Sequence, residues 1–302
     1  MLNDVKGVKT TLNISCVILN YNDADTTISL VEEIKNYSSL DHIIIVDNLS
    51  TDDSYKKLEK IVSQKITLIL ANKNGGYGYG NNLGIRKAYN EFHSDYIIIA
   101  NPDVHFTEKS LETMAEQLRN DKNTCIVAPR ALKPNGENQT LIAWKLQKRT
   151  DYILSASMIY IKYFSKKYYD AAYFENKSKA EVDVVPGSLL MVNSEYMLKY
   201  GMYDEGIFLY GEEETLALKF RENNLKTILL LDETYIHEHS VSISKSFPKA
   251  IKQKKMNLDS RYYLVKKYYN ITKIQEKIVR YFFKVAYFEN KLIFKIKDLR
   301  RN

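Results

Sequence analysis

Short runs of β-branched residues alternate with amphipathic segments between residues 11 and 128 of this 302-residue chain. The runs, such as 43–46 and 97–100, are continuously apolar, which is typical of parallel strands that helices cover on both faces. The alternation predicts strands at 11–19, 42–47, 66–70, 95–100 and 125–128, and helices at 24–36, 53–62, 80–92 and 108–119. It indicates an α/β fold built on a mostly parallel sheet.

The second half of the chain is less regular. Residues 151–182 are rich in Tyr, Lys and Ser and are interpreted as an insertion. Regular structure is predicted to resume with a strand at 182–192, a helix at 213–222 and a strand at 226–231. Two helices are expected at 249–269 and 272–299. We therefore predict an α/β domain over 1–246 and a helical C-terminal extension over 247–302.

Charge is distributed unevenly along the chain. The net charge is +7, but residues 249–302 alone carry 16 basic and 4 acidic side chains, so the preceding residues are slightly acidic. An acidic body is unsuited to binding the phosphate backbone of nucleic acid, and we predict no nucleic-acid partner. The sequence lacks an apolar run long enough to span a bilayer and shows no secretory signal, so we expect a cytoplasmic protein.

A glycine-rich segment, Asn74-Gly75-Gly76-Tyr77-Gly78-Tyr79-Gly80, invites comparison with nucleotide-binding loops. The dinucleotide fingerprint fails because Asn81 and Leu83 stand where a third glycine is required, and the P-loop pattern fails because Asn81 and Asn82 replace Lys and Ser/Thr. The segment is interpreted as a turn that brings backbone amides and the Asn81 and Asn82 side chains close to a ligand.

Polar residues follow three of the predicted strands. They are Asn20-Tyr21-Asn22, Asp47-Asn48 with Ser50-Thr51-Asp52, and Asn101-Pro102-Asp103. The carboxyl ends of strands in an open α/β sheet are where ligands bind, so these residues are expected to lie together.

Taken in order, these motifs resemble those of family 2 glycosyltransferases with the GT-A fold, and among them the rhamnosyltransferase-type bacterial enzymes. The resemblance spans residues 12–242 and includes Pro186-Gly187-Ser188, Glu212-Glu213 and His237-Glu238-His239. It implies that Asp47 hydrogen-bonds a nucleobase, that Tyr21 packs against that base and that Asn82 helps to hold the nucleotide. The implied nucleotide-sugar site comprises Asn20, Tyr21, Asn22, Asp47, Asn48, Gly76, Asn81, Asn82, Asn101 and Asp103.

The resemblance also implies a divalent cation, Mn²⁺ or Mg²⁺, bound between the protein and the diphosphate of the donor. Asp103 is the expected ligand, at the end of an Asp-X-Asp-like motif whose first position is Asn101. Imidazole suits Mn²⁺ better than Mg²⁺, and His237 is expected to be the second ligand, with His239 as the alternative.

Sugar transfer with inversion needs a carboxylate that removes the proton of the acceptor hydroxyl. By the resemblance Glu213 is the base and Glu212 its partner in the catalytic pair, although Glu replaces the Asp that is usual at position 213. Gly187 and Ser188 are expected on the acceptor side, where small residues allow a sugar to approach closely.

The sequence thus favours an inverting, metal-dependent glycosyltransferase. It would move a sugar from a nucleoside diphosphate, dTDP-rhamnose or a UDP-hexose, to a glycan or lipid-linked glycan in bacterial surface polysaccharide synthesis. Two alternatives stay open: a nucleotidyltransferase on a related fold, and a non-catalytic subunit that binds nucleotide sugars.

The basic extension contains ten Phe and Tyr residues between 249 and 302. One interpretation is peripheral contact with the inner face of the cell membrane, aromatic side chains inward and Lys and Arg towards anionic lipid. The other is a helical hairpin that packs on the α/β domain or on another subunit.

Overall fold

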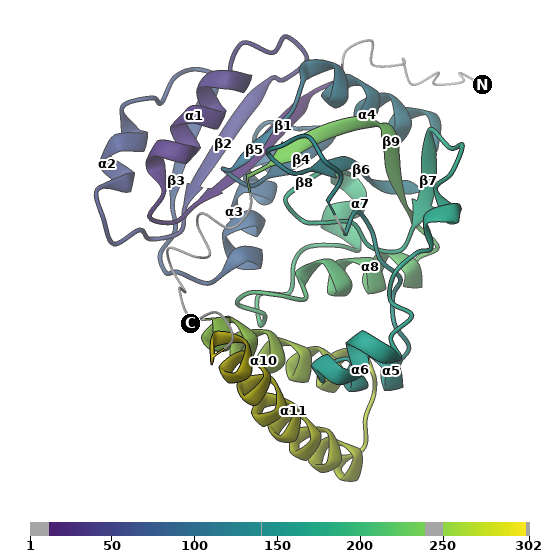
Figure 1. Cartoon of the computed structure of the whole chain (residues 1–302). Helices are drawn as coiled ribbons and strands as arrows, with labels where there is room; N and C mark the ends of the chain where they lie inside the picture. The colour runs from purple at the N-terminus through teal and green to yellow at the C-terminus, as the bar shows by residue number, and fades with distance from the viewer. Residues whose placement is uncertain (1–11, 140, 239–249, 300–302) are drawn as a thin grey trace, which may run out of the picture.

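The computed structural model describes residues 12–139, 141–238 and 250–299. Their strands form one nine-stranded sheet in the order β3-β2-β1-β4-β8-β6-β9-β5, with β7 also paired to β9 (Figure 1). The strands are β1 (Ile14–Asn20), β2 (His42–Asp47), β3 (Ile66–Leu70), β4 (Tyr96–Ala100), β5 (Val104–His105), β6 (Thr124–Leu132), β7 (Lys179–Val182), β8 (Leu189–Asn193) and β9 (Lys226–His237).

The sheet is mixed, as its pairings show. Strands β1 to β4 are parallel to one another, and β6 is parallel to β9, whereas β8 runs antiparallel between β4 and β6. The register pairs Asn20 with Asp47 and Ala100 with Leu189. The carboxyl ends of β1, β2 and β4 therefore meet the beginning of β8 at one edge, where the polar motifs follow.

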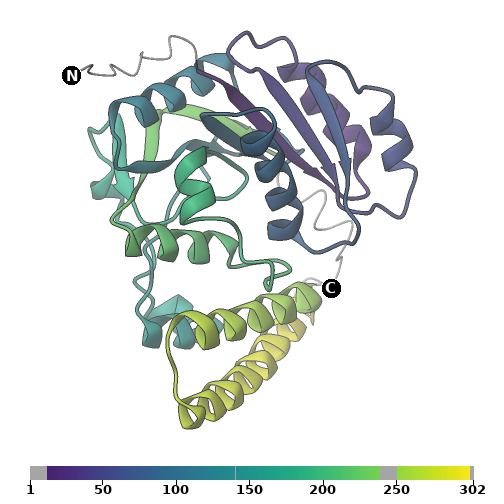
Figure 2. The same ribbon diagram turned by 180° about the vertical axis from the view of Figure 1, so that it is seen from behind.

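Helices cover both faces of the sheet, as Figures 1 and 2 show. One core contains side chains of α1, α2 and α4, and the other contains side chains of α3, α7 and α8. Successive strand residues divide between the cores, with Cys16 in the first and Val17 in the second, which explains the continuous apolar runs. The helices are α1 (Ala24–Ile34), α2 (Ser54–Glu59), α3 (Tyr77–Asn90), α4 (Glu108–Asn120), α7 (Ser194–Lys199) and α8 (Glu212–Glu222).

The predicted strand at 182–192 is wrong. The apolar run is broken at Pro186-Gly187, so that β7 ends at Val182 and β8 begins at Leu189. Strand β7, at the end of the segment interpreted as an insertion, pairs antiparallel with β9. The rest of that segment forms α5 (Arg149–Leu154), α6 (Met158–Tyr163) and a 3₁₀ turn, η1 (Ala171–Tyr173).

The glycine-rich segment also differs from expectation, because residues 77–80 form the first turn of α3 instead of a loop. Gly76 precedes the helix with φ of 88°, and a Cβ atom there would lie 2.1 Å from the Phe208 carbonyl oxygen. Gly80 and Gly84 let α3 approach β1, since a Cβ atom would lie 2.2 Å from Leu19 at Gly80 and 2.4 Å from Val17 at Gly84. These three glycines are therefore needed for the close packing of α3 and its first turn against neighbouring residues.

The two helices expected in the extension are confirmed as α10 (Ala250–Tyr268) and α11 (Lys273–Leu299). A third apolar core joins them to the body, with contributions from Tyr152 of α5, Leu218 of α8, Leu264 of α10 and Phe283 of α11. Among the described helices, none has the length and apolar character needed to cross a bilayer.

Candidate active site

A buried hydrogen-bond network joins the carboxyl ends of β1 and β2. Asn20 donates to Asp47 Oδ2 at 2.8 Å, and the Ser50 backbone and hydroxyl donate to the same carboxylate at 2.8 and 2.7 Å. Asn22 accepts from the Thr51 backbone at 2.7 Å. Asp47 is fully buried, so in this structure its carboxylate fixes the loop after β2, and its contact with a nucleobase stays a prediction.

The neighbouring asparagines divide into two groups. Asn48 donates to Asn74 Oδ1 and to the Gly76 carbonyl, while Asn81 donates to the Tyr77 carbonyl; the Oδ1 atoms of both are buried without a partner among the described residues. Asn82 instead makes three bonds within the protein, two with the Tyr203 backbone and one with Glu205. Its side chain therefore ties α3 to the loop that leads towards α8.

Asp103 and His237 come together as the sequence predicts. Asp103 follows β4 and His237 ends β9, and the pairing of Val104 with His237 brings His237 Nε2 within 3.3 Å of Asp103 Oδ1. Asp103 is 4% exposed, and its carbonyl accepts a hydrogen bond from the Glu238 backbone at 3.0 Å. His239 lies outside the described residues.

These two side chains fit a divalent cation. One carboxylate oxygen and one imidazole nitrogen 3.3 Å apart are close enough to be neighbouring ligands of a single ion. Within the part of the chain that the structure describes, three or more His, Cys, Asp or Glu residues do not gather at any such site. The remaining ligands would therefore come from a bound diphosphate and water.

Short contacts connect this pair to the acidic start of α8. The Asn101 backbone donates to the Ser188 carbonyl at 2.8 Å, and the Ser188 hydroxyl lies 2.6 Å from the Tyr235 hydroxyl, two residues before His237. Next to Ser188, a Cβ atom on Gly187 would lie 3.0 Å from Glu213 Oε1. The 187–188 turn therefore contacts the Glu213 side chain on one side, and on the other the residues two positions before Asp103 and His237.

The three glutamates at the start of α8 differ in environment. Burial, and then repulsion from Glu214, raises the pKa of Glu213 to about 7. Burial, and then repulsion from Glu213, raises the pKa of Glu212 well above its usual value, and Glu212 Oε1 is buried without a partner among the described residues. Although burial opposes it, the attraction of Lys167 lowers the pKa of Glu214. Glu213 is thus a carboxylate that can exchange a proton near neutral pH.

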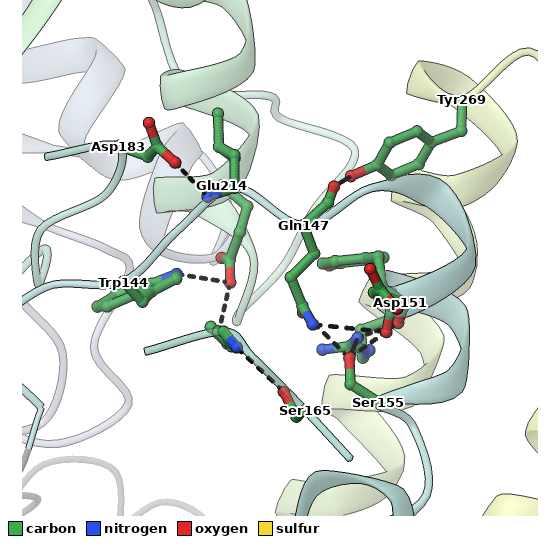
Figure 3. A network of polar contacts seen from close by, with 12 residues as sticks. Trp144, Gln147, Asp151, Ser155, Ser165, Asp183, Glu214 and Tyr269 are labelled. Atoms are coloured by element: carbon green, nitrogen blue, oxygen red, sulfur yellow. Dashed lines mark hydrogen bonds and ion pairs between the residues drawn. The ribbon is translucent and has the colours of Figure 1, made fainter. Parts of the chain in front are cut away.

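Glu214 anchors the inserted segment, as Figure 3 shows. Its Oε1 accepts from Trp144 Nε1 and from Lys167 Nζ, both at 3.1 Å. Around it, the Leu146 backbone donates to Asp183, and the Tyr269 hydroxyl donates to the Gln147 carbonyl (Figure 3). Sequence reasoning missed Lys167 and the anchoring role of Glu214, because no local pattern pairs residues 47 positions apart. Tyr235 was also missed, although strand periodicity would have placed it on the same face as His237.

Replacing Lys167 with Met should lower the free energy of unfolding by about 3 kcal/mol, because it leaves the buried Glu214 carboxylate without its cation. The lowered pKa of Glu214 means that its ionised form stabilises the fold above about pH 4.5 and that this stabilisation is lost on acidification. Urea unfolding at neutral and acid pH measures the difference, which should shrink in acid. Lys166→Met, at the exposed neighbouring residue, is the control. Equal stability of the two variants would contradict a stabilising role of the Lys167–Glu214 pair.

Known proteins resemble this chain in sequence and in fold. The sequence profile of glycosyl transferase family 2 matches residues 15–187. The chain belongs to this family. The low-salt glycan biosynthesis hexosyltransferase Agl10 of Haloferax volcanii is 25% identical to this family 2 chain over 225 residues, which are 74% of this chain and 66% of that protein. The chain therefore spans just under two thirds of this relative.

Two solved structures show the same fold as this family 2 chain. The mannosyltransferase PcManGT of Pyrobaculum calidifontis, in complex with GDP-Man and Mn²⁺, aligns with a TM-score of 0.56 at 13% identity, over 90% of this chain and 69% of that one. GalNAc-T7 with UDP, GalNAc and Mn²⁺ aligns with a TM-score of 0.57 at 14% identity, over 76% and 44%. The expected GT-A fold and family are thereby confirmed.

Proposed function

We propose that this family 2 chain transfers a hexose from a nucleoside diphosphate to a hydroxyl group of a glycan or lipid-linked glycan, with inversion. The observation that supports the proposal is that Asp103 and His237 are paired, and that the 187–188 turn contacts both Glu213 and the chain segments that carry this pair. A cation-binding pair and a proton acceptor that share one site would supply what departure of a diphosphate and attack by an alcohol require. The hexosyltransferase relative, the GDP-Man bound to PcManGT and the UDP and GalNAc bound to GalNAc-T7 support the choice of substrate class.

Each group has a distinct task in the proposed reaction. Asp103 Oδ1 and His237 Nε2 would hold the cation, which when bound would neutralise charge on the departing nucleoside diphosphate. Glu213 would accept the proton of the acceptor hydroxyl as its oxygen forms a bond to C1 of the donor sugar and the C1–phosphate oxygen bond breaks. The proposed contacts of the nucleotide remain Asp47, Tyr21 and Asn82, together with Asn48 and Asn81.

The leaving product tests this function directly. Incubation with Mn²⁺, UDP-hexoses, GDP-mannose and dTDP-rhamnose in turn, with a panel of glycan acceptors, should release a nucleoside diphosphate together with an extended glycan. Chromatography with mass detection identifies both products. Release of pyrophosphate would instead indicate nucleotidyl transfer. Binding of a donor without turnover on any acceptor would indicate a non-catalytic subunit.

A further inference from the structure

Helix α11 lies at the outer edge of the molecule, with α10 between it and α8 (Figures 1 and 2). It buries Val279, Phe283, Ala286 and Asn290 against the third core and the end of α5. A helix that packs only on this face needs polar side chains over the rest of its surface. In α11 that requirement is not met.

A second apolar face runs along α11 away from the core. Six side chains, spaced alternately by four and three residues, are between 47% and 73% exposed: Ile274, Ile278, Tyr281, Val285, Phe288 and Leu292. At 100° per residue they lie within about 80° of one another around the helix, in a line roughly 27 Å long. We call them the apolar stripe. An exposed apolar surface of this extent marks an interaction site.

A row of cations borders one side of the apolar stripe. Lys273, Lys277, Arg280, Lys284, Lys291 and Lys295 are all exposed and occupy the adjacent sector of the helix. We call them the basic stripe. The acidic residues of the described part of α11 are engaged elsewhere, since Glu276 pairs with Lys266 and Tyr262, and Glu289 accepts from the Ile159 backbone. The outward face of α11 is therefore apolar and cationic, and carries no carboxylate between 273 and 296.

Helix α6 extends the exposed apolar surface beside α11. The Ile159–Glu289 hydrogen bond joins the two helices on the side of the apolar stripe opposite the basic stripe. Ile159, Tyr163 and Phe164 are between 52% and 65% exposed, and the Lys162 ammonium lies over the Tyr163 ring. Two elements far apart in sequence thus present aromatic and aliphatic side chains on neighbouring surfaces.

We propose that this surface binds an anionic lipid bilayer, with the apolar stripe inserted at the interface and the basic stripe against the lipid phosphates. Charge decides between this occupant and a second copy of the chain. Two α11 helices that paired through their apolar stripes would bring the twelve cations of the two basic stripes together, and residues 273–296 offer no carboxylate on this outward face to offset them. An anionic bilayer offers both an apolar layer and the opposite charge, and each Lys or Arg near its surface strengthens binding.

Vesicle co-sedimentation of the full chain tests the proposal. The protein should sediment with phosphatidylglycerol–phosphatidylcholine vesicles and much less with phosphatidylcholine alone, and binding should weaken as salt rises. The double variant I278S/F288S should lower vesicle affinity by more than about tenfold, because it removes two inserted side chains. The pair K277E/K284E should lower affinity for the anionic vesicles by more than about tenfold and leave the weak binding to neutral vesicles unchanged.

Matched controls lie far from α11. Val62→Ser removes an apolar side chain that is 48% exposed, and Lys60→Glu reverses an exposed cation; both should sediment like the unmodified chain. The Asp103→Asn variant should also bind vesicles normally, which separates this inference from the proposed catalysis. Unchanged vesicle binding in both stripe variants would overturn the proposal. So would a solution dimer, measured by light scattering, that I278S/F288S converts to a monomer.

Discussion

Replacing Glu213 with Gln is expected to lower kcat by about 10³-fold, because the amide cannot accept the proton of the acceptor hydroxyl. The amide keeps the size of the carboxyl group, so it can still lie against the 187–188 turn. Donor binding should change little, since the cation-binding pair is untouched. Initial rates at saturating donor and acceptor, with a thermal shift for donor binding, separate the two effects.

The pH dependence gives this prediction a second test. Burial and Glu214 raise the pKa of Glu213 to about 7, so the rate of the unmodified chain should fall about tenfold per pH unit well below 7, and E213Q should lose that dependence. A carboxyl group whose pKa is raised by folding contributes stability at pH values below its pKa in the unfolded chain. This contribution is lost as the pH rises through its folded pKa of about 7. E213Q should therefore be at least as stable as the unmodified chain at pH 8, which excludes unfolding as the cause of its inactivity.

Glu222→Gln is the matched control, because this exposed glutamate ends the same helix. It should leave both kcat and the pH profile unchanged. A residual rate in E213Q within a few fold of the unmodified chain would remove Glu213 from the proposed role and direct attention to Glu212.

The Asp103→Asn substitution is expected to lower kcat/KM by about 10³-fold, through loss of a charged cation ligand. The fold should survive, because the Asp103 carbonyl that accepts from the Glu238 backbone is kept. Mn²⁺ binding provides a readout independent of turnover: calorimetric titration in the presence of a nucleoside diphosphate should show at least about tenfold weaker binding in D103N.

Asp232→Asn is the control for this substitution, since Asp232 is exposed on the same strand as His237. It should retain both Mn²⁺ binding and transfer. The stabilisation by nucleotide and Mn²⁺ should persist in E213Q and disappear in D103N, because ligand binding to the native state raises its melting temperature. Persistence of both Mn²⁺ binding and activity in D103N would refute the cation site.

The parallel half of the sheet could be predicted from the sequence because β2 and β4 each hold a buried, continuous apolar run, and β1 and β3 are apolar over most of their length. The break between Val182 and Leu189 was missed, although Pro186-Gly187 is a turn signal that interrupts the apolar run. Strand β7 carried a usable signal: Lys179, Ala180, Glu181 and Val182 alternate between exposed and buried, as a half-covered edge strand should.

The site was predictable where it depends on strand ends. Asp103 follows β4, and His237 is the last residue of β9. The pairing register of β5 with β9 brings the two residues together. The contacts of Asn82 with the Tyr203 backbone, and of Glu214 with Lys167, depend on the path of long connections, which composition does not specify. The sequence pattern therefore indicates which residues belong to the candidate site, but not which of them stabilise the surrounding loops through contacts within the protein.

Helix α10 binds the loop that leads to the glutamates at the start of α8. Tyr263 and Tyr268 donate to the Asp204 carboxylate, Lys267 pairs with it at 2.8 Å, and Ser260 donates to the Leu209 carbonyl at 2.7 Å. A shortened chain ending before α10 would strip these partners from a segment only a few residues ahead of Glu213. A fragment without α10 and α11 would therefore keep the sheet but lose the contacts that hold the 204–209 loop before α8, so an expression fragment should include both helices.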